Sequence, residues 1–243
     1  MTGGIPRQMG ILADRYLTLV LADPWQTLLL LLQAPAIAGL VALRWHGAPQ
    51  TSALAYVLVL SCLWFGVINS CREIVKERAI FERERLLGLS ILAYVGSKLQ
   101  VLALLTFVQC LLLQGTLHYW LGLNGPPLLL FATLWLTSLA GVALGLLISA
   151  ISGTPDRAVS IAPLVTIPQI LFSRLILPEA TLTGWARPIE KMMILRWAFD
   201  GADALVQSSW TWWPLWQDWG ALLGFLIACG IGCTVVLASQ EPT

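Results

Sequence analysis

The stretch Cys71–Lys98 reads CREIVKERAIFERERLLGLSILAYVGSK and interrupts an otherwise apolar chain. Nine of its first fifteen residues are charged. Each charge at the centre of a bilayer costs about 2.5–3.5 kcal/mol, so this stretch does not cross a membrane. It lies in water or against another protein, between two segments that do cross. We interpret it as the site at which a soluble partner binds the chain.

The composition of the whole chain is that of an integral membrane protein. Hydrophobic residues make up 58% and charged residues 11% of the 243 residues, and the mean hydropathy is +0.79. Soluble domains carry about 25% charged residues. We therefore predict an all-α fold with a single polytopic domain over residues 1–243. The net charge of +1 gives no support to nucleic-acid binding, and no histidine or acid beside Cys229 and Cys233 points to a metal site.

Six apolar segments have the length of transmembrane helices. We place the first five at about residues 25–43, 51–70, 96–121, 128–151 and 158–177. The sixth starts in a tryptophan cluster, typical of the membrane interface, and ends near Ala238. Asp23 and Pro24 suit an N-cap and the first turn of the first span. The pattern of residues 9–22 indicates an amphipathic helix on the membrane surface, and residues 178–212 indicate an extracellular or re-entrant helical segment.

Lys and Arg residues are distributed unequally between the two sides of this predicted membrane topology. Six spans place both termini on one side, together with the charged stretch. Nine Lys and Arg fall on that side and five on the other. The excess predicts a plasma (inner) membrane protein whose two termini and charged stretch are cytoplasmic.

Within the charged stretch, the pattern Glu77-Arg78-x-x-Phe81-x-Arg83-Glu84 is followed by Gly88, Tyr94 and Lys98. This pattern resembles the first intracellular loop of ABC-2 type permeases, and above all of the G-subfamily half-transporters. The resemblance extends over nearly the whole chain. It implies that residues 71–90 form a coupling helix region docked on a nucleotide-binding domain, and that residues 8–22 form a connecting helix beside it. The residues that it implicates in coupling are Glu77, Arg78, Phe81, Arg83 and Glu84.

Physical reasoning about the same stretch leaves two interpretations open. In one, Ile80 and Phe81 supply a compact apolar anchor for the partner, and the surrounding charges fix its register. In the other, the stretch is a solvated loop whose charges pair within the helix, as Arg78 and Glu82 do at i, i+4.

The resemblance also implies a substrate cavity at a dimer axis and a hydrophobic gate. The cavity candidates on the second and fifth spans are Trp64, Phe65, Asn69, Gln169 and Phe172. The gate candidates are Leu175 and Ile176. Arg174 departs from the family pattern, which has a small residue there, and it could snorkel to the surface, bind an anionic head group or face lipid. Aromatic residues at helical spacing are equally typical of core packing.

No G-x-x-x-x-G-K-[ST] motif and no recognisable catalytic constellation occurs in the sequence. We therefore expect no catalytic residues, metal or cofactor in this chain, with ATP and Mg²⁺ bound by a partner ATPase domain or subunit. The leading hypothesis is an exporter of a lipid or amphipathic molecule, built from two copies or from one copy and a close relative. A membrane scaffold or receptor that recruits a partner without transport is the alternative. An ion-coupled carrier would need an essential buried acid, and the sequence offers no candidate.

Overall fold

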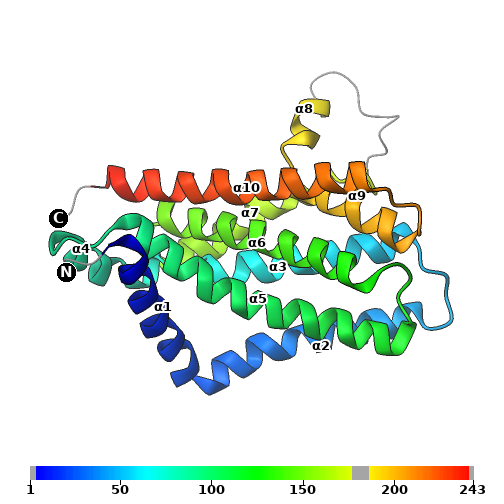
Figure 1. Ribbon diagram of the computed structural model, residues 1–243, viewed down its shortest axis with the longest axis horizontal. Coiled ribbons are helices and arrows are strands. Elements are labelled where there is room, and N and C mark those ends of the chain that lie inside the picture. Colours follow the sequence, from blue (N-terminus) through cyan, green and yellow to red (C-terminus); the bar gives the residue numbers. More distant parts are fainter. Residues whose placement is uncertain (1–3, 177–185, 241–243) are drawn as a thin grey trace.

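The computed structural model describes residues 4–176 and 186–240, in which every regular element is a helix (Figure 1). The first part of the predicted segment 178–212, up to residue 185, lies outside the described residues. The elements are α1 (Ile5–Ala22), α2 (Pro24–Trp45), α3 (Ser52–Ser70), η1 (Val75–Glu77), α4 (Arg78–Leu86), α5 (Ile91–Leu121), α6 (Pro127–Ile151), α7 (Pro155–Leu171), α8 (Ala186–Lys191), α9 (Ile194–Val206) and α10 (Trp212–Ser239).

Five segments of the described chain are long and apolar enough to cross a membrane, one fewer than expected. They contain α2, α3, α5, α6 and α10. The predicted fifth span, 158–177, is α7, which has 17 residues and ends at Leu171. At a rise of about 1.5 Å per residue α7 is about 25 Å long, which falls short of a hydrocarbon core of about 30 Å. Pro163 and Pro168 lie within α7, and turns follow it.

The helix boundaries follow from local chemistry. The Asp23 carboxylate accepts a hydrogen bond from the Gln26 backbone N–H at 3.1 Å, which confirms the predicted N-cap of α2. The structure starts α5 at Ile91, five residues before the predicted position. The same helix ends at Leu121 and is followed by the C-cap Gly122, whose φ of 59° is the left-handed conformation that glycine adopts without steric cost.

The core of the molecule is the close contact between α3 and α6, which small residues make possible. A Cβ on Gly145 would lie 2.0 Å from Ser70 Oγ, and one on Gly141 would lie 2.7 Å from the Leu63 carbonyl oxygen. Gly66 on α3 approaches the α6 backbone in the same way. Gly141 and Gly145, four residues apart on α6, therefore allow the two helices to approach closely.

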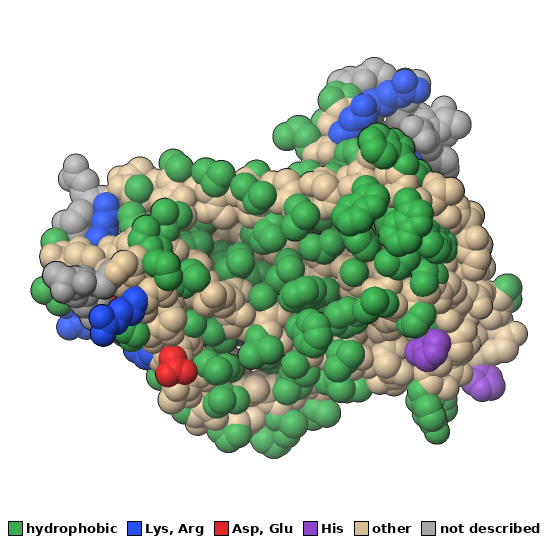
Figure 2. Space-filling model, viewed as in Figure 1, with side chains coloured by type: hydrophobic (Ala, Val, Ile, Leu, Met, Phe, Trp, Pro, Cys, Tyr) green, Lys and Arg blue, Asp and Glu red, His purple; other side chains and the backbone are tan. Residues whose placement is uncertain are grey.

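Figure 1 shows both described ends of the chain beside α4, at one end of the helix bundle, while α8 and α9 lie at the other end. Hydrophobic side chains cover the middle of the visible face in Figure 2, and Lys and Arg gather near α4 and on α8. This distribution is the one expected of a bundle that spans a membrane. We call the two ends the α4 end and the distal end.

Candidate coupling site

At the α4 end, the charged stretch folds into η1 and α4 and is tied to α1 by two side-chain contacts. The Arg15 guanidinium makes a two-pronged ion pair with the Glu84 carboxylate. The Tyr16 hydroxyl donates a hydrogen bond to Glu73. The hydrogen bond to Glu84 raises the pKa of Arg15 above its ordinary value. The predicted connecting helix therefore lies against the predicted coupling region.

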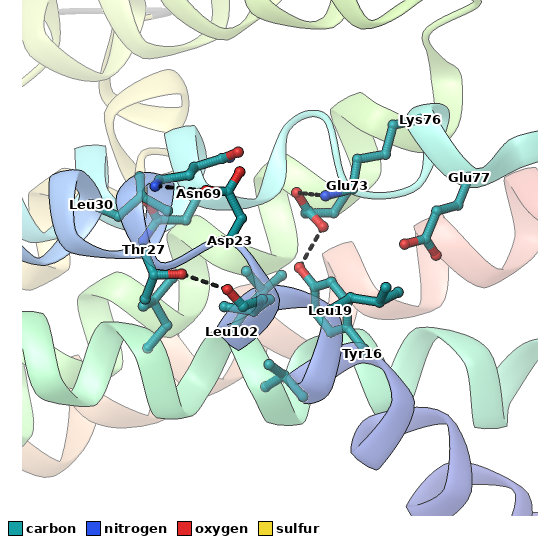
Figure 3. Close-up of a pocket in the computed structure, with 14 residues that line it drawn as sticks. Tyr16, Leu19, Asp23, Thr27, Leu30, Asn69, Glu73, Lys76, Glu77 and Leu102 are labelled. Atoms are coloured by element: carbon teal, nitrogen blue, oxygen red, sulfur yellow. Dashed lines mark hydrogen bonds and ion pairs between the residues drawn. The ribbon is translucent and has the colours of Figure 1, made fainter.

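A buried polar network adjoins this contact, and Figure 3 draws its members Tyr16, Glu73, Lys76 and Glu77. Lys98, whose side chain is 2% exposed, reaches from α5 to the Glu77 carboxylate with an Nζ–Oε2 distance of 2.7 Å. Its ammonium lies 3.6 Å from the centre of the Tyr16 ring, a cation–π contact. Figure 3 shows Glu73 between Tyr16 and Lys76, which donates to Glu73 at 2.7 Å. The network joins α1, η1 and α5.

The protonation of this network follows from its burial. Burial raises the pKa of the Tyr16 hydroxyl well above its ordinary value, and the charge of Glu73 raises it further. Tyr16 is therefore a hydrogen-bond donor throughout the neutral range. Removing two opposite charges from water is costly unless each finds a partner. The contacts of Lys98 with Glu77 and with the face of the Tyr16 ring meet that condition.

Phe81 does not offer its ring to a partner. It is 3% exposed and packs on Tyr94 of α5, with ring centres 4.5 Å apart. The expectation that Phe81 forms part of an exposed anchor is therefore wrong, because α4 turns this face inward. The outward apolar side chains are Ile80, Leu86 and Leu87.

Arg78 and Arg85 bind the ends of other helices. Arg78 Nη2 donates to the Ala150 carbonyl at the end of α6 at 2.8 Å and to Gln240 Oε1 at 3.0 Å. Arg85 Nη1 donates to the carbonyls of Leu237 at 2.9 Å and Gln240 at 2.6 Å. Cations that bind terminal carbonyls stabilise a helix C-terminus. The solvated-loop interpretation, with Arg78 paired to Glu82, is therefore wrong in its pairing.

Sequence reasoning missed Glu73, Arg85 and Gln240, which complete this site. The charge of Glu73 and Arg85 was visible in the sequence, but their partners lie on α1 and α10, far along the chain. Of the coupling candidates, Arg83 points to solvent, and its one hydrogen bond within the described residues is a long one of 3.4 Å to the Ala79 carbonyl. The role of these residues in coupling stays a prediction.

A cavity of about 260 Å³ opens beside the network, between α1, α2, α3 and α5. Asn69 lines it, together with Glu73 and apolar side chains of α1 and α5. Asn69 Nδ2 donates to Gln109 Oε1 at 2.7 Å, and Gln109 donates to the Leu30 carbonyl of α2 at 2.7 Å. Asn69 therefore also ties α3 to α5 and, through Gln109, to α2.

The other predicted cavity residues point in different directions. Trp64 is exposed, whereas its neighbour Phe65 is fully buried in the core. Gln169 is buried and accepts a hydrogen bond from the backbone N–H of Leu195 at the start of α9. Phe172 is half-buried in the turn after α7. Phe65 and Gln169 serve packing within the chain, so the set does not form one continuous wall.

The predicted gate residues Leu175 and Ile176 lie in the turns that follow α7 and are exposed. Their gating role stays a prediction. Arg174, by contrast, is part-buried and paired: its Nε lies 2.9 Å from Glu190 Oε1 and its Nη1 lies 2.9 Å from Asp200 Oδ2. These two ion pairs were not expected from the sequence, and a position of Arg174 at the membrane surface, at an anionic head group or against lipid stays a prediction.

The comparisons with known proteins agree with the geometry of the α4 end. The family model for the ABC-2 type transporter matches residues 7–206, which include most of α1, the charged stretch and the helices up to α9. This chain is a member of the ABC-2 type transporter family. Its resemblance to this family, seen in the pattern from Glu77 to Lys98, is therefore confirmed.

One curated relative is named for both an ATP-binding and a permease function. An ABC transporter ATP-binding/permease protein of Mycobacterium tuberculosis is 28% identical over 224 aligned residues. The match covers 82% of this chain and 25% of the relative, so the chain spans about a quarter of that protein. As an ABC-2 type domain, the chain is a permease component and is not itself the catalyst. Among the described residues, no group of three His, Cys, Asp or Glu side chains is placed to hold a metal ion.

Proposed function

We propose that this ABC-2 type chain is the membrane half of an ATP-driven exporter of a lipid or amphipathic molecule, moved by residues 71–90. The observation that carries the proposal is the network at the α4 end. A displacement of α4 cannot stay local, because Arg15–Glu84 joins it to α1 and Arg85 joins it to α10. The adjoining η1 is held to α5 by Glu77–Lys98. An ATPase that pushes α4 would therefore move helices on both sides of the bundle, a rigid-body transition.

The ATPase would contact the exposed part of α4. Ile80, Leu86 and Leu87 form an apolar group there, and Arg83 lies among them on the solvent side. An apolar centre with charges at its edge is typical of a specific interface. The M. tuberculosis relative, whose name gives both an ATP-binding and a permease function, supports an ATPase as the partner.

We further propose that α7 is a sixth, short crossing. Its start follows Ile151, near Arg78 at the α4 end, and its Gln169 contacts the start of α9 at the distal end. The chain therefore runs the length of the bundle between α6 and α9. This supports a topology with both termini cytoplasmic in the plasma (inner) membrane, in line with the Lys and Arg excess. The short length of α7 would thin the bilayer locally or place its ends among other helices.

The transported molecule would pass between two membrane domains, this one and a second copy or a close relative. One face of α3 supports the pairing, because Val57, Trp64 and Ile68 recur there at helical spacing and remain wholly or partly exposed. Leu164 and Ile167 give α7 a similar apolar face. Walls of this chemistry suit a lipid or amphipathic molecule.

The test is Glu77→Gln in the complete transporter, reconstituted in vesicles with its ATPase, with lipid export and ATP hydrolysis measured in the same sample. We expect export per ATP hydrolysed to fall about tenfold, within the range of coupling energies between sites. Glu82→Gln on α4 is the matched control, because Glu82 makes no ion pair within the described chain. An unchanged export ratio in both variants would overturn the assignment.

Leu86→Asp tests the partner itself. It places a charge in the proposed contact and should release the ATPase from the purified permease without changing the fold, since Leu86 is exposed. The scaffold alternative predicts that the partner retained by the wild-type chain and lost by Leu86→Asp has no ATPase activity.

A further inference from the structure

At the distal end, a cavity of about 420 Å³ lies between α9 and the start of α10. We call it the distal cavity. Ligand sites for small molecules commonly have about 300–1,000 Å³. Its walls combine tryptophans with charged and hydroxyl side chains, and none of the proposed coupling residues lines it. The charged side chains in or beside it are Arg174, Glu190, Arg196, Asp200, Asp203 and Asp218.

Both guanidinium groups at the distal cavity have a carboxylate partner, although Arg196 Nη1 is buried without a hydrogen bond in the described chain. Arg174 lies 2.9 Å from both Glu190 and Asp200. Arg196 Nε lies 3.0 Å from Glu190 Oε1. Four carboxylates therefore surround two guanidinium groups, and two of the four acids have no ion-pair partner in the described chain. They are Asp203, whose Oδ1 is buried without a hydrogen bond in the described chain, and Asp218.

Asp218 is the better candidate of the two for binding a cation. It is 6% exposed, it lines the distal cavity, and it makes no hydrogen bond or ion pair with any residue among 4–176 and 186–240. Its carboxylate sits against Gly201 of α9, where a Cβ would lie 3.4 Å from Oδ2. A buried carboxylate without a partner is costly. A cation in the cavity would remove that cost.

The surroundings of Asp218 favour an organic cation over a metal ion. In the described chain no three acids, histidines or cysteines converge closely enough to hold a metal. Trp197 and Trp210 line the same cavity, and aromatic faces attract ammonium groups. Trp197 already holds the Arg196 guanidinium 4.1 Å from its ring centre, so this wall is suited to organic cations.

We propose that the distal cavity binds the ammonium group of an amine, with Asp218 and Asp203 as the anionic partners and the tryptophans as its walls. This inference stands apart from the coupling of α4, because none of the proposed coupling residues lines the distal cavity. The ammonium group belongs either to the head group of a lipid or to a free amine.

Calorimetric titration of choline into the full-length protein in anionic phosphatidylglycerol nanodiscs tests the proposal. We expect saturable heat with choline, none with NaCl at equal ionic strength, and none with 3,3-dimethyl-1-butanol, which has the shape of choline without its charge. Asp218→Asn should weaken choline binding at least tenfold, the loss expected for a desolvated charge pair. Asp156→Asn, which removes an exposed acid at the start of α7, should leave binding unchanged.

Absence of saturable choline binding to the wild type would overturn the proposal, as would equal affinities for the wild type and Asp218→Asn. If Asp218→Asn does not fold, Asp203→Asn takes its place: it should weaken binding about threefold, and an unchanged affinity would overturn the proposal. Repeating the titration in phosphatidylcholine nanodiscs, with affinities corrected for the lower choline concentration at an uncharged membrane surface, separates the two sources. Weaker choline binding there identifies a lipid head group as the occupant, and equal binding identifies a free amine; either result supports the ammonium site.

Discussion

Charges gather at both ends of this helix bundle, but they are used differently. At the α4 end, Lys98, Arg78 and Arg85 each bind an acid or a helix terminus on another element. At the distal end, Arg174 and Arg196 share the acids Glu190 and Asp200, while Asp203 and Asp218 make no ion pair within the described residues. Paired charges that join separate elements transmit displacement. Unpaired buried charges provide a place to bind.

This comparison bears on what each end can do. The contacts at the α4 end hold α1, α4, α5 and α10 in one arrangement, as a coupling element requires. The distal cavity keeps an unsatisfied charge, the situation in which a ligand of opposite charge gains most. Substitutions at each end test whether its buried charges are paired or unpaired.

The largest effect should come from Lys98→Met, which leaves Glu77 in a mostly buried position without its partner. Breaking one side of a buried ion pair costs about 3–5 kcal/mol. We expect the apparent melting temperature of the detergent-solubilised protein to fall sharply, and partial recovery in the double variant Lys98→Met with Glu77→Gln. Lys76→Met is the control, since the Lys76 side chain is 42% exposed. A melting temperature equal to that of the wild type would mean that this pair does not hold η1 to α5.

A smaller loss is expected for Glu190→Gln at the distal end. It removes the acid shared by Arg174 and Arg196 and leaves a buried guanidinium with weaker hydrogen bonds. We expect the free energy of unfolding to fall by about 2–3 kcal/mol, which is measured as a lower melting temperature. The control Asp156→Asn, at an exposed position, should change the free energy of unfolding by no more than about 0.5 kcal/mol. Equal stability of both variants would show that the distal pairs are dispensable.

Arg85→Ala should lower the stability of the end of α10 by about 1–2 kcal/mol, because the carbonyls there lose their hydrogen-bond donor. Arg83→Ala, two residues away and exposed, should be nearly neutral. Hydrogen exchange of the last turn of α10 measures the effect directly. Faster exchange in both variants, or in neither, would contradict the assigned cap.

The smallest effect, and of opposite sign, should come from Asp218→Asn without ligand. Since Asp218 has no partner in the described chain, removing its charge should be neutral or stabilise the protein by up to about 1 kcal/mol. Melting temperatures in the absence of amines measure this. A marked destabilisation would reveal a partner for Asp218 and remove the contrast between the two ends.

Several features of this protein were predictable from local sequence. The N-cap at Asp23 follows from local hydrogen bonding, whereas the exclusion of residues 71–90 from the bilayer, which follows from charge cost, stays a prediction. The pattern from Glu77 to Lys98 was enough to predict the family. Each of these depends on residues within a few turns of one another, where spacing alone decides which groups meet.

Other features depended on the tertiary structure. Phe81 lies on a nine-residue helix, too short for its pattern to show which face turns inward, and the packing on Tyr94 decided it. Arg85 meets α10 carbonyls 152 to 155 residues away, and Arg174 meets Asp200 on a helix beyond a long connection. Asp218, the buried acid that sequence reasoning did not find, lies among tryptophans that predicted only a membrane interface. A charge finds its partner, or goes without one, only when distant helices pack, because side-chain pairing depends on distance in space and not on separation along the chain.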